Sequence, residues 1–244
     1  APSHWEDGRV PRGLESHPVV QVTWHDARAY CAWLTDKLRA EGAKAGRTRY
    51  PLPVWREGRL LPVDVDLAAL RFELPSEAEW EKAARGGLPT SPRGGEPAPM
   101  GSKSTHLSKG TEAGRAAAQP SGGRRPPSVY GGIEGGKREY PWGDDWQEGY
   151  CNSEELGVKG TTPVGIFPEG ASPYGVLEMV GNVWEWTRSL WGEGGSEPEF
   201  KYPYDPSDGR EDLSAGDEML RVLRGGAFLD YERLARCAFR CGNR

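Results

Sequence analysis

Residues 174–186, YGVLEMVGNVWEW, decide the fold of this chain. The stretch combines a Gly-rich turn with two Trp residues two positions apart. Side chains alternate between the faces of a strand, so Trp184 and Trp186 point the same way and the Glu between them points the other way. Gly181 and Asn182 supply the turn before the strand, because both residue types tolerate left-handed backbone angles. The spacing alone predicts a core hairpin with two buried Trp side chains.

The same stretch also offers oxygen ligands for a metal ion. Glu178 and Glu185 supply carboxylates, and the carbonyl groups of Gly181 and Val183 lie between them. Alternate carbonyls flanked by acids suit a hard, oxygen-seeking cation such as Ca²⁺. A structural Ca²⁺ site is therefore the alternative to a purely apolar hairpin.

Two helices are predicted upstream of this stretch. Residues 24–40 form the first, because Thr23 and Asp26 make a capping box and apolar residues then recur at helical spacing. Its predicted apolar face consists of Ala27, Tyr30, Cys31, Leu34 and Leu38. The second helix begins after Ser76, with Glu79 closing another capping box, and ends at a Gly-Gly pair.

The remaining segments differ sharply in composition. Residues 41–70 carry Gly, Pro and charges, which predict loop and a short strand. Residues 88–139 are rich in Gly, Pro, Ser and basic residues and cannot bury enough apolar area to offset the entropy of ordering. They predict a disordered insert at the domain surface. Residues 140–146, YPWGDDW, predict a turn anchored by two Trp, whereas residues 186–192 and 199–212 predict parts of a long surface loop.

The overall composition excludes several functional classes. The 244 residues are only 36% hydrophobic but include 34 Gly, 21 Pro and 10 Trp, which predicts a loop-rich domain with an aromatic core. A net charge of -5 argues against a nucleic-acid partner. Nothing resembles an apolar membrane span of about 18 residues. Four Cys without a CxxC pair predict neither a disulfide framework nor a zinc site. Without a visible signal peptide, a cytoplasmic location is the default expectation.

Six sequence blocks, in this order, resemble the formylglycine-generating enzyme (sulfatase-modifying factor) family, whose GNVWEW signature lies in the stretch quoted first. The blocks cover residues 17–34, 71–87, 140–146, 161–192, 202–212 and 221–228. The resemblance implies an α+β fold of the C-type lectin-like type, with two helices packed on short antiparallel sheets. It also implies a single domain over residues 1–244 that lacks the family's N-terminal start and its closing strand.

A second oxygen-rich loop follows Cys151. Asn152, the carbonyl of Ser153, Glu155 and the carbonyl of Val158 are placed to surround a cation. The resembled family carries a calcium-binding loop in this region, but Leu156 stands where its acid aligns. We therefore expect Ca²⁺ as the cofactor, at one or both of the two loops.

The family resemblance also implies where catalysis would occur. The resembled enzymes oxidise a Cys of a sulfatase to formylglycine with two Cys that hold copper shortly after an RGG element. Here Asp230 stands at the position of the first Cys, and the second falls near Ala235. Cys237 and Cys241 lie nearby, with Cys237 expected to face the core from a strand. Cu(I) requires soft thiolate ligands, so neither copper binding nor catalysis is expected.

The C-terminal segment 228–244 is instead predicted to be the binding surface of a non-catalytic ligand-binding domain, with Phe228 and Ala238 turned toward the core. The expected ligand-binding residues are Leu229, Asp230, Tyr231, Leu234, Phe239, Cys241 and Gly242. Their types match those that adenine-directed mutagenesis of AAC codons yields in variable proteins of diversity-generating retroelements, some of which share this fold. The partner would be a protein or surface ligand. The alternatives are a sulfatase-directed oxidase and an accessory domain of a larger effector protein.

Overall fold

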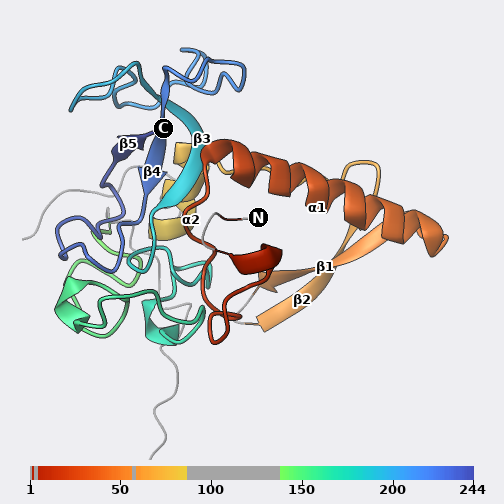
Figure 1. Ribbon diagram of the computed structural model, residues 1–244, viewed down its shortest axis with the longest axis horizontal. Coiled ribbons are helices and arrows are strands. Elements are labelled where there is room, and N and C mark those ends of the chain that lie inside the picture. Colours follow the sequence, from red (N-terminus) through yellow and green to blue (C-terminus); the bar gives the residue numbers. More distant parts are fainter. Residues whose placement is uncertain (1, 3–4, 57–58, 87–137) are drawn as a thin grey trace, which may run out of the picture.

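The computed structural model describes residues 2, 5–56, 59–86 and 138–244 (Figure 1). The predicted insert, apart from residues 138 and 139, lies outside the described residues. In chain order the elements are η1 Glu6–Gly8, α1 Trp24–Lys44, β1 Arg49–Arg56, β2 Arg59–Asp66, α2 Glu77–Arg85, η2 Glu154–Leu156, η3 Pro168–Gly170, β3 Glu185–Gly192, β4 Leu220–Arg224 and β5 Cys241–Asn243.

Helix α1 begins at the predicted capping box and runs four residues beyond the predicted end. Its buried face is covered by the extended segment that precedes α2: Phe72 N donates to Thr35 Oγ1, and Gly42 lies against the Leu67 side chain. Four of the five predicted apolar residues are partly buried on this face. The prediction was wrong for Tyr30, which is 58% exposed because it lies beside the covered stripe.

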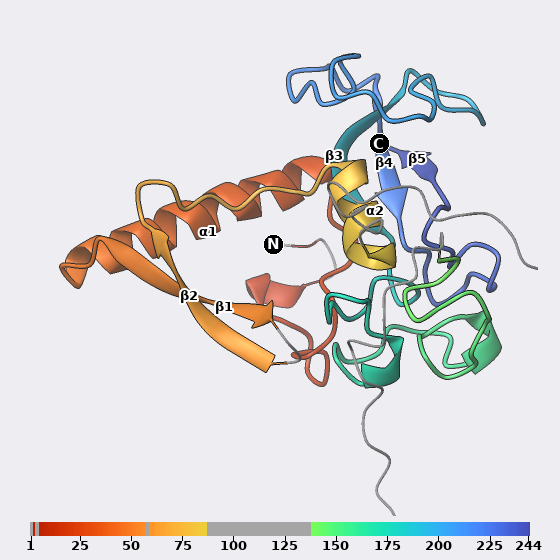
Figure 2. The same ribbon diagram turned by 180° about the vertical axis from the view of Figure 1, so that it is seen from behind.

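Strands β1 and β2 form an antiparallel hairpin, from Arg49 opposite Asp66 to Arg56 opposite Arg59. The sequence prediction of loop and a short strand missed its extent. Three Pro residues lie within it, and Pro is tolerated there because each strand of a two-stranded sheet has a free edge. The hairpin lies beside the C-terminal half of α1, away from the other sheet (Figures 1 and 2).

Strands β3, β4 and β5 form the second sheet, with β4 in the centre, and α2 packs against β3 and β4. Residues 186–192 were wrongly predicted as part of a long surface loop, because they belong to β3. Their polar side chains suggested an exposed segment, but the strand is buried. Thr187, for example, is fully buried, and its Oγ1 donates to Val222 O at 2.9 Å. Trp184 and Trp186 are only partly buried, so the prediction of two buried Trp was also wrong.

Two small apolar clusters hold the loops, one of them against α2. One contains Trp80, Ala84, Met179 and Cys237. The other contains Cys151, Val180 and Ala235, against which Trp142 and Trp146 pack. The predicted YPWGDDW turn is confirmed, since Tyr140 stacks on Trp142 with ring centroids 5.5 Å apart. Among the described residues, no helix has the length and apolar character needed to cross a bilayer.

Candidate functional site

The turn at Gly181 and Asn182 holds three loops together. Both residues adopt positive φ angles, 76° and 63°, as their types predict. Gly181 N donates to Gly225 O, Asn182 N donates to Asn152 O, and Phe228 N donates to Asn182 O. The loop after Cys151, the signature turn and the loop after β4 are therefore joined through their main chains.

The side chain of Asn182 makes this junction specific. Asn182 is 1% exposed, and its Oδ1 accepts hydrogen bonds from Thr162 N and Asn152 Nδ2. Its Nδ2 donates to Thr162 O and to Glu178 Oε2. Sequence reasoning identified Asn182 only as a turn former. The signal that could have identified its role is an amide side chain within a stretch expected to be buried. A buried amide requires hydrogen-bond partners, which here come from other segments of the fold.

The predicted cation loop after Cys151 contains buried oxygen atoms without hydrogen-bond partners. These are Asn152 Oδ1 and Glu155 Oε2. The other oxygen of Glu155 accepts from Glu232 N at 2.8 Å, and the Ser153 carbonyl accepts from Leu156 N. Val158 is 50% exposed at the end of the loop. A buried carboxylate oxygen and a buried amide oxygen without partners fit the donor chemistry of a hard cation.

The second predicted cation site, around the signature turn, has its oxygens largely engaged. Both carboxylate oxygens of Glu178 accept hydrogen bonds, and Gly181 O accepts from Val183 N. Glu185 Oε2 accepts from Trp80 Nε1 at 2.5 Å. Burial, opposed by the Trp80 hydrogen bond and reinforced by the nearby Glu178 charge, raises the pKa of Glu185 from 4.5 to about 7.

No group of three or more His, Cys, Asp or Glu side chains is arranged to bind a metal within the part of the chain that the structure describes. A cation at either loop would therefore depend on carbonyl and amide oxygens together with one or two carboxylates. Ca²⁺ accepts such ligand sets. The fit is better at the loop of Asn152 and Glu155, where oxygens are unpartnered.

The loop after β4 presents two apolar side chains to solvent on a restrained backbone. Leu229 is 61% exposed and Tyr231 is 54% exposed. Between them, Asp230 turns inward: its Oδ2 accepts from Ala227 N at 2.8 Å, and its carbonyl accepts from Glu154 N at 3.0 Å. Asp230 thus closes its own turn and ties the loop to η2.

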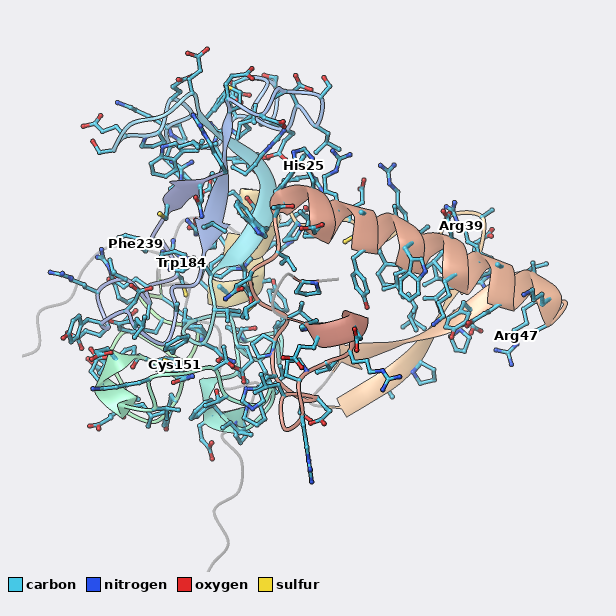
Figure 3. The ribbon with its side chains drawn as sticks, in the orientation of Figure 1. His25, Arg39, Arg47, Cys151, Trp184 and Phe239 are labelled. Carbon is cyan, nitrogen blue, oxygen red and sulfur yellow. The ribbon has the colours of Figure 1, made fainter. Side chains whose placement is uncertain are left out.

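The other predicted ligand-binding residues are less exposed. Leu234 is partly buried, and the Phe239 ring centroid lies 5.9 Å from that of Trp184. Both residues are labelled in Figure 3. Cys241 and Gly242 belong to β5 and pair with β4. A β-carbon on Gly242 would lie 2.5 Å from the Trp191 ring. Gly242 therefore presents only main-chain atoms to any ligand.

The two C-terminal thiols do not lie on one strand. Cys237 lies in a turn, is fully buried against Trp80 and Met179, and has its pKa raised to about 12 by burial. Its predicted burial is confirmed, but the predicted strand is wrong. Cys241 lies in β5, and burial raises the pKa of its thiol as well. Ala238, predicted to face the core, is exposed because the chain turns there.

A buried ionic cluster beneath this segment escaped the sequence analysis. Arg224 and Glu77 are both fully buried and form an ion pair of 3.1 Å. Arg224 Nη2 also contacts Glu81 Oε2 at 2.9 Å, and Arg240 Nη2 donates to Glu77 Oε2 at 2.7 Å. Charged residues on a capped helix are typical of a solvated face, so nothing in the local pattern indicates this burial. The cluster connects α2, β4 and the C-terminal segment.

This architecture, with two helices, short antiparallel sheets and long loops joined at a GNVWEW turn, is the α+β, C-type lectin-like fold of the formylglycine-generating-enzyme type. The chain matches the family described as "Sulfatase-modifying factor enzyme 1-like domain" over residues 1–244. It belongs to that family.

Its relatives include proteins named as enzymes and proteins named as inactive. The chain is 30% identical to a "Formylglycine-generating enzyme" of Mus musculus, over 96% of this chain and 44% of the relative. It is 28% identical to an "Inactive C-alpha-formylglycine-generating enzyme 2" of Bos taurus, over 93% of this chain and 45% of the relative. The chain thus spans less than half the length of these relatives.

Two solved structures are more distantly similar. "Treponema denticola variable protein 1" is 20% identical, with a TM-score of 0.48, covering 99% of this chain and 71% of that one. PvdO from Pseudomonas aeruginosa is 19% identical, with a TM-score of 0.43, covering 93% and 56%.

Proposed function

We propose that this chain is a non-catalytic ligand-binding domain whose binding surface is the C-terminal segment 228–244. The observation that carries the proposal is the loop of Leu229 and Tyr231, which exposes two large apolar side chains on a backbone held by Asp230. Such side chains contribute contact area at low entropic cost when the backbone is already ordered.

The chemistry of the thiols supports a non-catalytic role. Cu(I) is held by soft thiolate ligands. The Cys237 thiol lies in an apolar cluster, where burial favours its protonated form, and the Asp230 carboxylate is engaged with Ala227 N. Relatives named as enzymes and relatives named as inactive both occur, so family membership favours neither alternative.

A narrower form of the proposal is a variable protein of a diversity-generating retroelement. Exposure at Leu229 and Tyr231 is compatible with substitution there, whereas Gly242 has no room for a side chain. A near-identical template repeat and a reverse transcriptase gene beside this gene are the expected genomic features. If both features are absent, the retroelement proposal is wrong, whereas the broader ligand-binding proposal is unaffected.

We also propose that a structural Ca²⁺ stabilises the loops beneath this surface. Asn152 and Glu155, with the carbonyls of Ser153 and Val158, would hold it at the first loop. The second candidate ligand set consists of Glu178, Glu185 and the carbonyls of Gly181 and Val183. Positive charge at either place would offset buried carboxylates and hold the loops together.

The catalytic alternative is tested directly with purified protein, Cu(I), oxygen and a CxPxR peptide, with mass spectrometry to detect the aldehyde. We expect no aldehyde. Aldehyde that forms with the natural chain and disappears in Cys237→Ser or Cys241→Ser would overturn the proposal.

The ligand-binding proposal is tested with a displayed library of random peptides, from which binders to the immobilised protein are selected. Peptides that bind the natural chain should lose binding to a Leu229→Asp, Tyr231→Ser double variant. That variant should unfold within a few degrees of the natural chain, because both side chains are solvent-exposed. Selected peptides that bind both proteins equally would place the binding surface elsewhere.

A further inference from the structure

A groove of about 360 Å³ runs along α1, on the face that residues 71–74 cover. This volume lies within the roughly 300–1,000 Å³ of ligand sites in proteins. Figures 1 and 2 place α1 and the C-terminal segment on opposite sides of β3, so the groove is separate from the surface proposed above. Arg28 and Arg39 both line the groove from α1. They lie about 16 Å apart along the helix axis, at a rise of about 1.5 Å per residue.

These two guanidinium groups have no carboxylate partner among the described residues. Arg28 Nη1 donates to the carbonyl of Leu213 at 3.2 Å, and its guanidinium lies 4.7 Å from the Trp24 ring centroid. Arg39 Nη2 donates to the carbonyl of Ala68 at 3.2 Å, whereas its Nε is buried without a partner. Each keeps donors and a full positive charge available to an anion.

The two other Arg residues of the lining are already neutralised. Arg71 forms an ion pair with Glu73, and Arg188 forms ion pairs with Glu79 and Glu211. They therefore frame the groove without adding free charge. Free positive charge remains at Arg28 and Arg39. It is opposed by the exposed carboxylate of Asp36 on the same lining and by the second of the two Glu partners of Arg188.

The wall opposite α1 is an extended segment without a strand partner in the described parts of the chain. Residues 71–74 belong to no sheet. Phe72 N donates to Thr35 Oγ1, and the Leu74 carbonyl accepts from Arg188 Nη1. An unpaired extended segment beside a groove can receive a second extended chain through its remaining main-chain groups.

We propose that this groove binds an acidic, extended segment of a partner protein, with carboxylates on Arg28 and Arg39. Guanidinium and carboxylate groups form strong, two-pronged hydrogen bonds. Side chains on one face of an extended peptide recur about every 7 Å, so acids at alternate positions over seven residues span the two Arg. Ala32, Phe72 and Leu74 also line the groove and offer apolar contacts to the peptide.

The test uses a fluorescein-labelled peptide, Glu-Thr-Glu-Val-Glu-Thr-Glu, and a matched peptide with Gln in place of each Glu. Fluorescence anisotropy should show binding of the Glu peptide only. Arg28→Gln and Arg39→Gln should each weaken it about tenfold, the size expected for a charge-assisted hydrogen bond. Asp36→Asn should tighten it severalfold by removing the opposing charge, an effect that a purely structural role does not predict.

Arg47→Gln is the matched control. Arg47 is exposed, follows the C-terminal end of α1 and is absent from the groove lining. Figure 3 shows it beyond Arg39, at the far end of α1. It should leave binding unchanged. Equal binding of the Gln peptide, or an Arg39→Gln variant that binds normally, would overturn the proposal. Displacement by phosphate or single-stranded DNA at the same charge concentration would also overturn it. Thermal unfolding verifies each variant; if Arg28→Gln does not fold, Arg39→Gln and Asp36→Asn decide.

Discussion

Gly181 has a φ of 76°, and a β-carbon added to it would lie 2.5 Å from the carbonyl oxygen of Asn152. Two separate constraints therefore act on this residue, one from the backbone angle and one from the neighbouring main chain. Most other Gly residues with positive φ meet only the first. Gly149, for example, has a φ of 83° and open space around it.

Comparing Gly181→Ala with Gly149→Ala separates these two constraints. Gly149→Ala should lower the free energy of unfolding by about 1 kcal/mol, the cost of a left-handed Ala. Gly181→Ala should lower it by about 3 kcal/mol, because the main chain of Asn152 must also move. Urea unfolding measures both. Equal losses would show that the main chain of Asn152 can move away from an added β-carbon at little energetic cost.

Glu185 predicts a pH dependence of stability in the absence of divalent cations. Its pKa is raised from 4.5 to about 7 in the folded state by burial. The folded state thus holds the proton more tightly, and stability is lost as the pH rises from about 4.5 through 7. In EDTA, the free energy of unfolding should fall by about 2 kcal/mol across this range. Glu185→Gln should lack this component, and an unchanged pH profile in that variant would contradict the assignment.

At the level of elements, α2 joins the sheet through charge as well as through apolar contact. Glu77 follows the Ser76 cap and faces Arg224 on β4 and Arg240 before β5. The Arg240 guanidinium also lies 5.5 Å from the Trp191 ring centroid on β3. A single carboxylate of α2 therefore organises groups from two strands and the C-terminal segment.

Removing that carboxylate should be costly. Glu77→Gln leaves the fully buried Arg224 with only Glu81 as an acidic partner, so the free energy of unfolding should fall by about 3 kcal/mol. Glu79→Gln is the matched control, because Gln still closes the capping box and Arg188 keeps its ion pair with Glu211. It should cost less than about 1 kcal/mol. Chemical denaturation distinguishes the two, and a Glu77→Gln variant as stable as the control would refute this role.

At the level of the whole molecule, the proposed binding surface is built mainly from long loops. They are held by main-chain bonds at the Asn182 junction and by two small apolar clusters. Such a structure has little apolar burial per residue, so an ion shared by several loops would contribute much of its stability. We therefore expect the proposed Ca²⁺ to stabilise the whole fold rather than one loop.

Calcium at about 100 times its dissociation constant should stabilise the fold by about 2.7 kcal/mol. For a domain of this size, that corresponds to an increase in Tm of roughly 5–10 °C over EDTA. Differential scanning calorimetry measures the shift. Asn152→Ala should abolish it if the first loop holds the ion, and Glu185→Gln should do so if the signature turn holds it. A Tm that changes with neither EDTA nor calcium would contradict the proposed structural ion.

The sequence alone determined the features that depend on neighbouring residues. The capping boxes at Thr23 and Ser76 and the left-handed turn at Gly181 and Asn182 follow from local hydrogen bonds and local backbone sterics. The fold class was predicted from the resemblance of six ordered blocks to a known family, and the family match over residues 1–244 agrees with it. Cys237 was also correctly predicted to be buried.

Only the tertiary structure decided which polar residues are buried and what they meet. Thr187, Arg224 and Glu77 have the types of a solvated surface, yet all are fully buried because distant segments supply their partners. In the same way Arg28 and Arg39, ordinary residues of a helix in the sequence, became the two ends of a groove once residues 71–74 packed beside α1. Hydrogen-bond and ion-pair partners that come from distant segments of the chain leave no periodic signal in the local sequence. Their effect exists only after the segments meet.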